Sequence, residues 1–113
     1  MRVLDSDEAA VDDLFASHAA CMADTHSLKE EEGKLHTLEY FVSKAKELDD
    51  MMDSSKGSTG YIIYRVSEVH KDDEHFGKYV EMGQNWSRIS EFFEVFEKYD
   101  PLVTMGRCVT AKL

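Results

Sequence analysis

Residues 61–70 read YIIYRVSEVH, and residues 103–113 read VTMGRCVTAKL. Both segments are rich in β-branched and aromatic residues, which is typical of strands. Between them, residues 89–100 read ISEFFEVFEKYD, and their large apolar side chains recur at helical spacing. The sequence therefore predicts a helix whose apolar stripe packs against a sheet, in an α+β domain.

The first half of the chain predicts a helix followed by another strand. Ser6 reads as an N-cap of a helix that runs to Ala23, because acidic residues follow it in the first turn. Its apolar face would carry Val11, Leu14, Phe15, His18 and Met22. Residues 24–34 are polar, and Gly33 is expected to stop any extension of the helix.

The segment LHTLEYFVSK, residues 35–44, predicts a strand with two distinct faces. One face would carry Leu38, Tyr40 and Val42. The opposite face would carry Thr37, Glu39 and Phe41. In the strand at 61–70, Ile62, Tyr64 and Val66 would likewise alternate with Tyr61, Ile63 and Arg65.

Residues 45–60 form the longest polar segment and contain Gly and Ser. The segment predicts a loop that protrudes as an arm or covers a site, since it is longer than ordinary hairpin loops. Further along, Asp72 and Asp73 open a helix, Gly83 and Asn85 interrupt it, and Ser87 caps the next helix.

The element order is most of a β-α-β-β-α-β pattern in one domain, residues 1–113, with helices on one face of an antiparallel sheet. Only Arg2, Val3 and Leu4 precede the first helix, so the first strand is either short or incomplete. The face without helices would carry Tyr61, Ile63, Phe41 and Cys108. Apolar residues on both faces predict a two-fold homodimer that covers this second face.

The pattern of residues 60–81 (GYIIYRVSEVHKDDEHFGKYVE) and 103–113 resembles the dimeric α+β barrel group of ferredoxin-like proteins. That group includes cofactor-free monooxygenases, muconolactone-isomerase-like proteins, stress-responsive barrel proteins and many members of unassigned function. The resemblance implies a sheet-to-sheet dimer without a cofactor, but it rests on an element pattern over residues 35–113 and assigns no residue a role.

The composition excludes several classes of partner. With a net charge of −10 and no run of Lys and Arg, the chain is not expected to bind nucleic acid or an anionic membrane surface. No segment has the ~18 consecutive apolar residues of a membrane span. The acidic N-terminus lacks the basic start of a secretory signal, so we expect a cytoplasmic protein with Cys21 and Cys108 reduced rather than disulfide-bonded.

His18 is the candidate catalytic residue. A histidine that faces the sheet can act as a general base, because modest burial moves its pKa across neutrality. The alternative is a core histidine bonded to a backbone carbonyl. His26 and His36 flank the acidic connection and are expected to be exposed.

Five further residues are candidates for ligand binding. Tyr40, Tyr64 and Trp86 could line a pocket between helices and sheet, although such aromatics also form ordinary cores. Arg65 and Arg107 could orient an acidic or carbonyl-bearing ligand. The alternative is that they pair with Glu39 or Glu68 across the sheet or across the dimer seam.

A histidine and carboxylate cluster lies at the junction after the strand at 61–70. His70, Asp72, Asp73, Glu74 and His75 have the side chains that zinc or iron prefers. Their spacing is not diagnostic of a metal site, and the acidic residues are already explained by the start of a helix. Neither a metal nor a cofactor is therefore expected.

Two functions from different classes follow. The first is a small-molecule-binding homodimeric barrel, which in its catalytic form is a cofactor-free monooxygenase or isomerase acting on a phenolic or enolisable compound. In that form His18 is the base, and Tyr64 or Arg65 holds the oxyanion. The alternative is a non-enzymatic structural or interaction module whose arm, with Met51 and Met52, contacts a partner protein.

Overall fold

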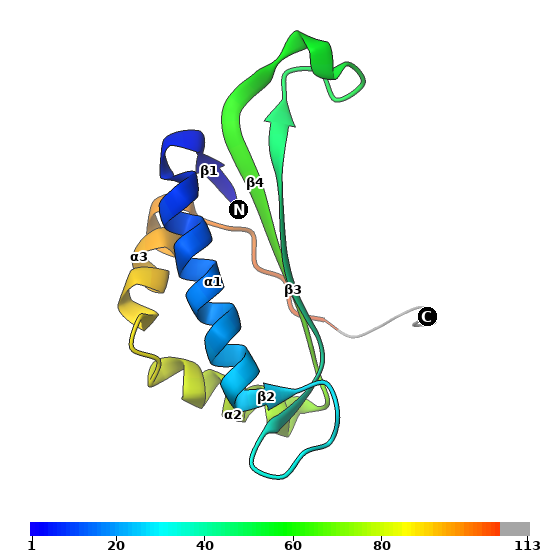
Figure 1. Ribbon diagram of the computed structural model, residues 1–113, viewed down its shortest axis with the longest axis vertical. Helices are drawn as coiled ribbons and strands as arrows, with labels where there is room; N and C mark the ends of the chain where they lie inside the picture. Colours follow the sequence, from blue (N-terminus) through cyan, green and yellow to red (C-terminus); the bar gives the residue numbers. More distant parts are fainter. Residues whose placement is uncertain (107–113) are drawn as a thin grey trace.

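The computed structural model describes residues 1–106 of the chain. It is an α+β fold with an open four-stranded mixed sheet and three helices, in a roughly ferredoxin-like arrangement (Figure 1). The strands, in the sheet order β1-β4-β3-β2, are β1 (Arg2–Leu4), β4 (Ser58–His70), β3 (Leu35–Leu48) and β2 (His26–Ser27). The helices are α1 (Glu8–Thr25), α2 (Asp73–Gln84) and α3 (Ile89–Tyr99).

The sheet is mixed rather than antiparallel as predicted. β1 and β3 both pair antiparallel with β4, whereas β2 pairs parallel with the start of β3. β2 is only two residues long, His26 and Ser27, and the chain enters it directly from α1. The short first strand does form: Val3 on β1 lies opposite Ile62 on β4.

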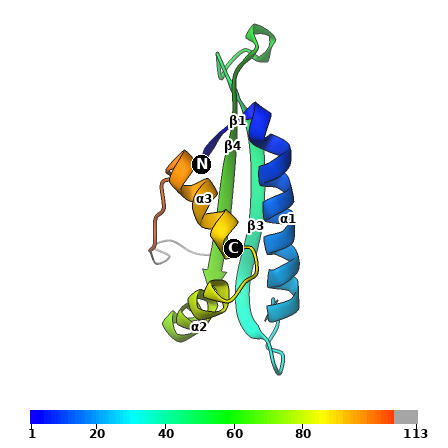
Figure 2. The same cartoon turned by 90° about the vertical axis from the view of Figure 1, so that its left-hand side faces the viewer.

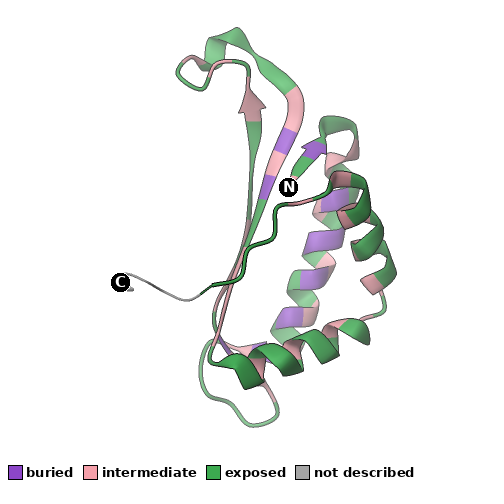
Figure 3. Ribbon diagram, turned by 180° about the vertical axis from the view of Figure 1, so that it is seen from behind, coloured by how far each residue is buried: buried purple, intermediate pink, exposed green. Residues whose placement is uncertain are grey.

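The three helices lie on one side of the sheet (Figures 1 and 2). The face predicted for the first helix is confirmed, and the buried positions recur along one side of α1 in Figure 3. The central cluster of buried residues consists of Val3, Val11, Phe15, Ile62 and Tyr64. The predicted capping residue is wrong, because Ser6 lies in a short 3-10 turn (Asp5–Asp7) and α1 begins after Asp7.

A β-bulge near Leu38 reverses the predicted faces at the start of β3. Thr37 pairs with His70 and Glu39 pairs with Val69, so Leu38 has no opposite residue on β4. Thr37, predicted to face away from the helices, is 2% exposed, and Leu38 is 43% exposed. After the bulge, Tyr40 and Val42 face the helices as predicted, opposite Glu68 and Val66.

The segment 45–60 is strand at its two ends, with the predicted loop confined to residues 49–57. β3 continues to Leu48 and β4 begins at Ser58, so the two strands form a long hairpin. Its end projects beyond α1 in Figure 1. The connection contains a 3-10 turn (Ser54–Lys56) and closes with a hydrogen bond from Asp49 N to Gly57 O of 3.1 Å. Gly57 has φ of +93°, a conformation that other residues rarely adopt.

Two helices follow the hairpin, as the sequence predicts. The Asp72 carboxylate accepts a hydrogen bond of 2.8 Å from the backbone N–H of His75 and so caps α2. α2 ends at Gln84, beside the predicted interruption. Arg88, not Ser87, precedes α3, and it has no side-chain capping bond.

The predicted final strand does not form over residues 103–106. These residues have no regular structure, and Val103 and Met105 are 64% and 80% exposed. The rest of that strand, including Arg107 and Cys108, lies outside the described residues. In the part that the structure describes, the α+β fold is therefore only roughly ferredoxin-like and has no last strand.

Among residues 1–106, no helix lies against the second face of the sheet (Figures 1 and 2). Phe41 on this face is 44% exposed, and Tyr61 and Ile63 are half-buried. The guanidinium carbon of Arg2 lies 3.5 Å from the centre of the Tyr61 ring, a close cation–π contact. None of the helices within residues 1–106 is long and apolar enough to cross a membrane.

Candidate functional site

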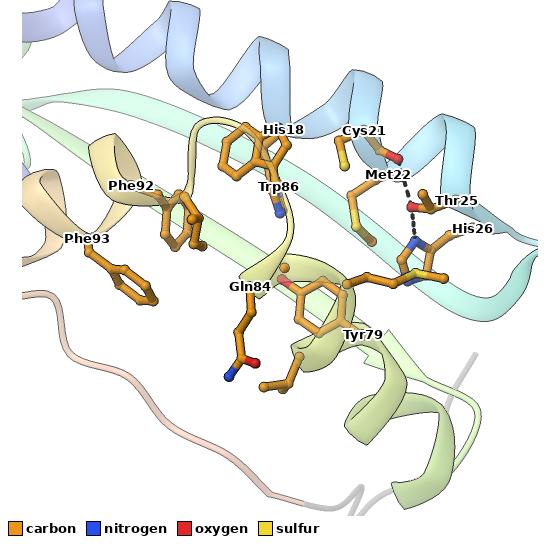
Figure 4. A pocket seen from close by; sticks show the side chains of 14 residues that line it. His18, Cys21, Met22, Thr25, His26, Tyr79, Gln84, Trp86, Phe92 and Phe93 are labelled. Carbon is orange, nitrogen blue, oxygen red and sulfur yellow. Dashed lines mark hydrogen bonds between the residues drawn. The ribbon is translucent and has the colours of Figure 1, made fainter.

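A cavity of about 180 Å³ lies between α1, α2 and α3 (Figure 4). α1 contributes His18, Cys21 and Met22 to its wall, and α2 contributes Tyr79 and Gly83. The chain between α2 and α3 and the start of α3 complete the wall with Trp86, Ile89, Phe92 and Phe93. In Figure 4 Trp86 and Phe92 lie at the His18 end, and Thr25, His26 and Tyr79 lie toward the other end.

His18 is fixed between the sheet and two aromatic rings. Its Nδ1 atom lies 2.6 Å from the hydroxyl oxygen of Tyr40 on β3. The rings of Trp86 and Phe92 lie 5.2 Å and 5.6 Å from the imidazole, measured between ring centres. With 8% of its surface exposed, His18 is buried but still forms part of the cavity wall.

Burial makes this pair uncharged at neutral pH. Loss of solvent lowers the pKa of His18, and the Glu68 carboxylate only partly opposes that shift. Burial and Glu68 both raise the pKa of Tyr40 well above its usual range. The contact is therefore a hydrogen bond between two neutral groups.

Glu68 is the centre of a second polar group behind the cavity. It lies opposite Tyr40 in the sheet and accepts a hydrogen bond of 2.9 Å from the hydroxyl of Tyr79 on α2. Its other oxygen lies 3.2 Å from Nε2 of His70. Burial, together with Glu68, raises the pKa of Tyr79 far above its usual range. These bonds stabilise a largely buried carboxylate and join α2 to β4.

His26 lies at the far end of the cavity and is only 7% exposed, so the prediction that it is exposed is wrong. The Thr25 hydroxyl donates to the backbone oxygen of Cys21 at 2.7 Å, so it must accept the bond of 2.8 Å from Nδ1 of His26. The Nε2 atom of His26 is enclosed without a partner among the described residues. Burial lowers the pKa of His26, and its neighbour His70 lowers it further.

The structure separates the other candidate residues. Trp86 lines the cavity with His18. Tyr40 is not part of the cavity wall and is linked to it by its hydrogen bond to His18. Tyr64 lies elsewhere: its hydroxyl donates to Asp12 at 2.6 Å and its ring stacks on Phe15. Burial raises the pKa of Tyr64, and the Asp12 carboxylate raises it further. The hydrogen bond from this tyrosine to Asp12 joins the sheet to α1.

Arg65 does not reach the cavity. It is exposed, points to the face without helices and lies opposite Ser43. Within this chain it pairs with neither Glu39 nor Glu68; Glu39 accepts a hydrogen bond from Ser67, and Glu68 accepts one from Tyr79. Arg107 lies outside the described residues.

Sequence reasoning missed the contribution of Glu68 and Tyr79. Glu68 falls on the same strand face as Ile62, Tyr64 and Val66, and an acid on an apolar face signals a buried polar contact. Tyr79 falls on the apolar stripe of α2 with Phe76 and Val80. Their contact could not be found without the packing of α2 on the sheet.

The candidate metal cluster serves as a helix cap. Asp72 accepts from His75 Nδ1 at 2.7 Å, in addition to its bond to the backbone of that residue. Within residues 1–106, no group of three or more His, Cys, Asp or Glu side chains is arranged to hold a metal ion.

Comparison with known proteins adds no assignment. No family model, no curated protein and no solved structure matches this chain. The resemblance to the dimeric α+β barrel group stays a prediction, and what can be said of function rests on the geometry of the cavity.

Proposed function

We propose that this protein binds a small, mainly apolar organic molecule in the cavity between the helices. The observation that carries the proposal is a cavity whose wall combines aromatic and sulfur-containing side chains with a buried histidine, His18. Binding sites commonly pair an apolar wall with a few fixed polar groups. The bond from Tyr40 holds His18 in one orientation, which reduces the entropy lost on binding.

The size of the cavity limits the ligand. Its volume of about 180 Å³ is slightly greater than the ~150 Å³ of an engineered apolar cavity that binds benzene. It is smaller than the ~300 Å³ at which drug-sized sites begin. A ligand that fits this cavity is therefore about the size of a single aromatic ring with one small substituent.

The same proposal includes a homodimer formed through the sheet face without helices. A second copy of this chain would remove Phe41, Tyr61 and Ile63 from water, which is favourable for apolar surface. A two-fold arrangement places the same patch on both partners, so no other surface is needed.

Catalysis is the stronger form of the proposal. This form requires the imidazole to carry its hydrogen on Nδ1, so that Nε2 takes a proton from the carbon beside a carbonyl and releases it to solvent, while solvent returns a proton to that carbon. Acetophenone in D₂O tests it, since enzyme-dependent deuterium incorporation into the methyl group would reveal the exchange. Incorporation that is lost in His18→Ala supports catalysis, and incorporation at the rate of buffer alone leaves binding as the function.

A second candidate function is an interaction module that uses the tip of the hairpin. Met51 and Met52 are 85% and 86% exposed there. Exposed methionines adapt to varied apolar surfaces, so this pair could contact a partner protein.

Two glycine substitutions on α2 test the binding proposal. Gly83 lines the cavity and Gly77 does not, and a Cβ added at either position would meet no atom within 4 Å. Gly83→Leu is expected to fill part of the cavity, whereas Gly77→Leu adds the same side chain on an exposed surface. Ethylbenzene binding, followed by protein NMR, should be lost in Gly83→Leu and kept in Gly77→Leu. Equal binding by both variants, or binding of neither ethylbenzene nor acetophenone by the unmodified protein, would overturn the proposal.

A further inference from the structure

The hydrogen atoms around His18 can be assigned from the acceptors that are present. The Tyr40 hydroxyl has one hydrogen, and its only hydrogen-bond partner among the described residues is Nδ1 of His18. If Nδ1 carried a hydrogen instead, the Tyr40 hydroxyl hydrogen would have no acceptor in a largely buried site, which is costly. Tyr40 therefore donates to Nδ1, and the neutral imidazole carries its hydrogen on Nε2.

The Nε2–H group is available to a ligand. It makes no hydrogen bond within residues 1–106, and it is not one of the fully enclosed side-chain atoms that lack a partner. The Nδ1 edge of the ring meets Tyr40, which is not part of the cavity wall, whereas His18 itself is. The cavity wall therefore presents the Nε2–H group of His18 as a hydrogen-bond donor, at the end where Trp86 and Phe92 lie.

The charges around the cavity disfavour an anion. No Lys or Arg side chain is among the described residues that line it. The Glu68 carboxylate acts on His18, His26 and Tyr40 closely enough to shift their pKa values. It lies behind the wall and is already bonded to Tyr79, so it offers a cation no direct contact.

We infer that the cavity recognises an uncharged, single-ring compound bearing a carbonyl or similar acceptor oxygen, which accepts a hydrogen bond from Nε2 of His18. This inference rests on the proposed binding function and specifies the ligand class for that site. It assigns His18 the role of a donor, where the sequence predicted a base.

Four probes of nearly equal size test the inference by protein NMR titration at pH 7.5. Acetophenone has the acceptor oxygen, and ethylbenzene has the same shape without it. Benzoate carries a negative charge, and 1-phenylethylammonium carries a positive charge. Acetophenone should bind about 3- to 10-fold more tightly than ethylbenzene, which corresponds to one hydrogen bond. Both ions should bind at least about tenfold more weakly than acetophenone, because burial removes their hydration.

The outcomes separate the two proposals. If none of the four probes binds, both the proposed function and this inference fail. If ethylbenzene binds as tightly as acetophenone, or if either ion binds best, the binding function stands and the inference is overturned.

Two variants locate the donor. In His18→Phe the preference for acetophenone over ethylbenzene should disappear, and in Gly77→Leu it should persist. If His18→Phe does not fold, Tyr40→Phe provides the second measurement, since it frees the imidazole to place its hydrogen on either nitrogen and should reduce the preference. An unchanged preference in the folded variants would contradict the assignment of Nε2 as the donor.

Discussion

The hydroxyl of Tyr40 on β3 lies 2.6 Å from Nδ1 of His18 on α1. This contact joins a strand to a helix at the wall of the cavity. It also distinguishes the two nitrogens of the imidazole, because one is bonded to the sheet and the other is left for a ligand. The orientation of His18 is thus set by the fold rather than by the ligand.

Tyr40→Phe should lower the free energy of unfolding by about 0.5–1.5 kcal/mol, since it removes one hydrogen bond and leaves Nδ1 without a donor. Chemical denaturation measures this change. The ¹⁵N shifts of His18 should report hydrogen on Nε2 in the unmodified protein and a mixture of tautomers in the variant. Tyr61→Phe, on the other face of the sheet, should leave the His18 shifts unaltered. Hydrogen on Nδ1 in the unmodified protein would contradict the assignment.

The stability of the protein should fall as the pH falls below about 6.5, the ordinary histidine pKa. His18 and His26 have lowered pKa values in the folded state. Between those lower values and 6.5 the unfolded chain binds more protons than the folded chain, so acid favours unfolding. The pKa of the Asp12 carboxyl is lowered by Lys44. Carboxylates of this kind lose their contribution to folding stability only near pH 4 and below.

Urea denaturation between pH 7.5 and pH 5 measures this dependence. The loss of stability over that range should be smaller in His18→Gln and in His26→Gln. His75→Gln, outside the cavity, is the matched control, and this variant should lose as much stability between pH 7.5 and pH 5 as the unmodified protein does. Stability that is constant or rises toward pH 5 would mean that the two histidines are not buried as described.

Ile63→Lys should convert the proposed dimer to a monomer, because it places a charge in the centre of the sheet face that a second copy would cover. Light scattering at micromolar concentration measures the mass. Met51→Lys, which adds the same charge at the exposed hairpin tip, should leave the dimer intact. A monomeric unmodified protein would rule out the dimer at these concentrations.

Replacing Met51 and Met52 together by Ser should change the free energy of unfolding by no more than about 0.5 kcal/mol, since both side chains are almost fully exposed. The same variant should bind ethylbenzene as the unmodified protein does. A large loss of stability would show that the tip covers part of its own protein and is not free to contact a partner.

The sequence predicts the α+β class and most helices because these depend on periodic apolar residues. The face of α1 that contains Phe15 and His18 is one such case. The bulge at Leu38 could not be predicted, because it shifts a pattern that otherwise alternates regularly. The absence of a strand at 103–106 also escaped prediction, since β-branched residues favour strands only where a neighbouring strand is available.

The site was predicted only in part. His18 and Trp86 were identified because a histidine and a tryptophan fell beside apolar stripes, and both line the cavity. His26 was misplaced because the polar sequence around it suggested exposure, while the turn from α1 into β2 buries it. Glu68 and Tyr79 come together only through the packing of α2 on the sheet.

The position of bound acetophenone, measured by intermolecular NOEs in isotope-labelled protein, tests directly whether the cavity binds this ligand through His18. We expect NOEs from the ligand to ring protons of Trp86 and Phe92, with a change in the His18 Nε2–H shift. NOEs to Phe41 or Ile63 on the uncovered sheet face, with no change at His18, would contradict binding in the cavity.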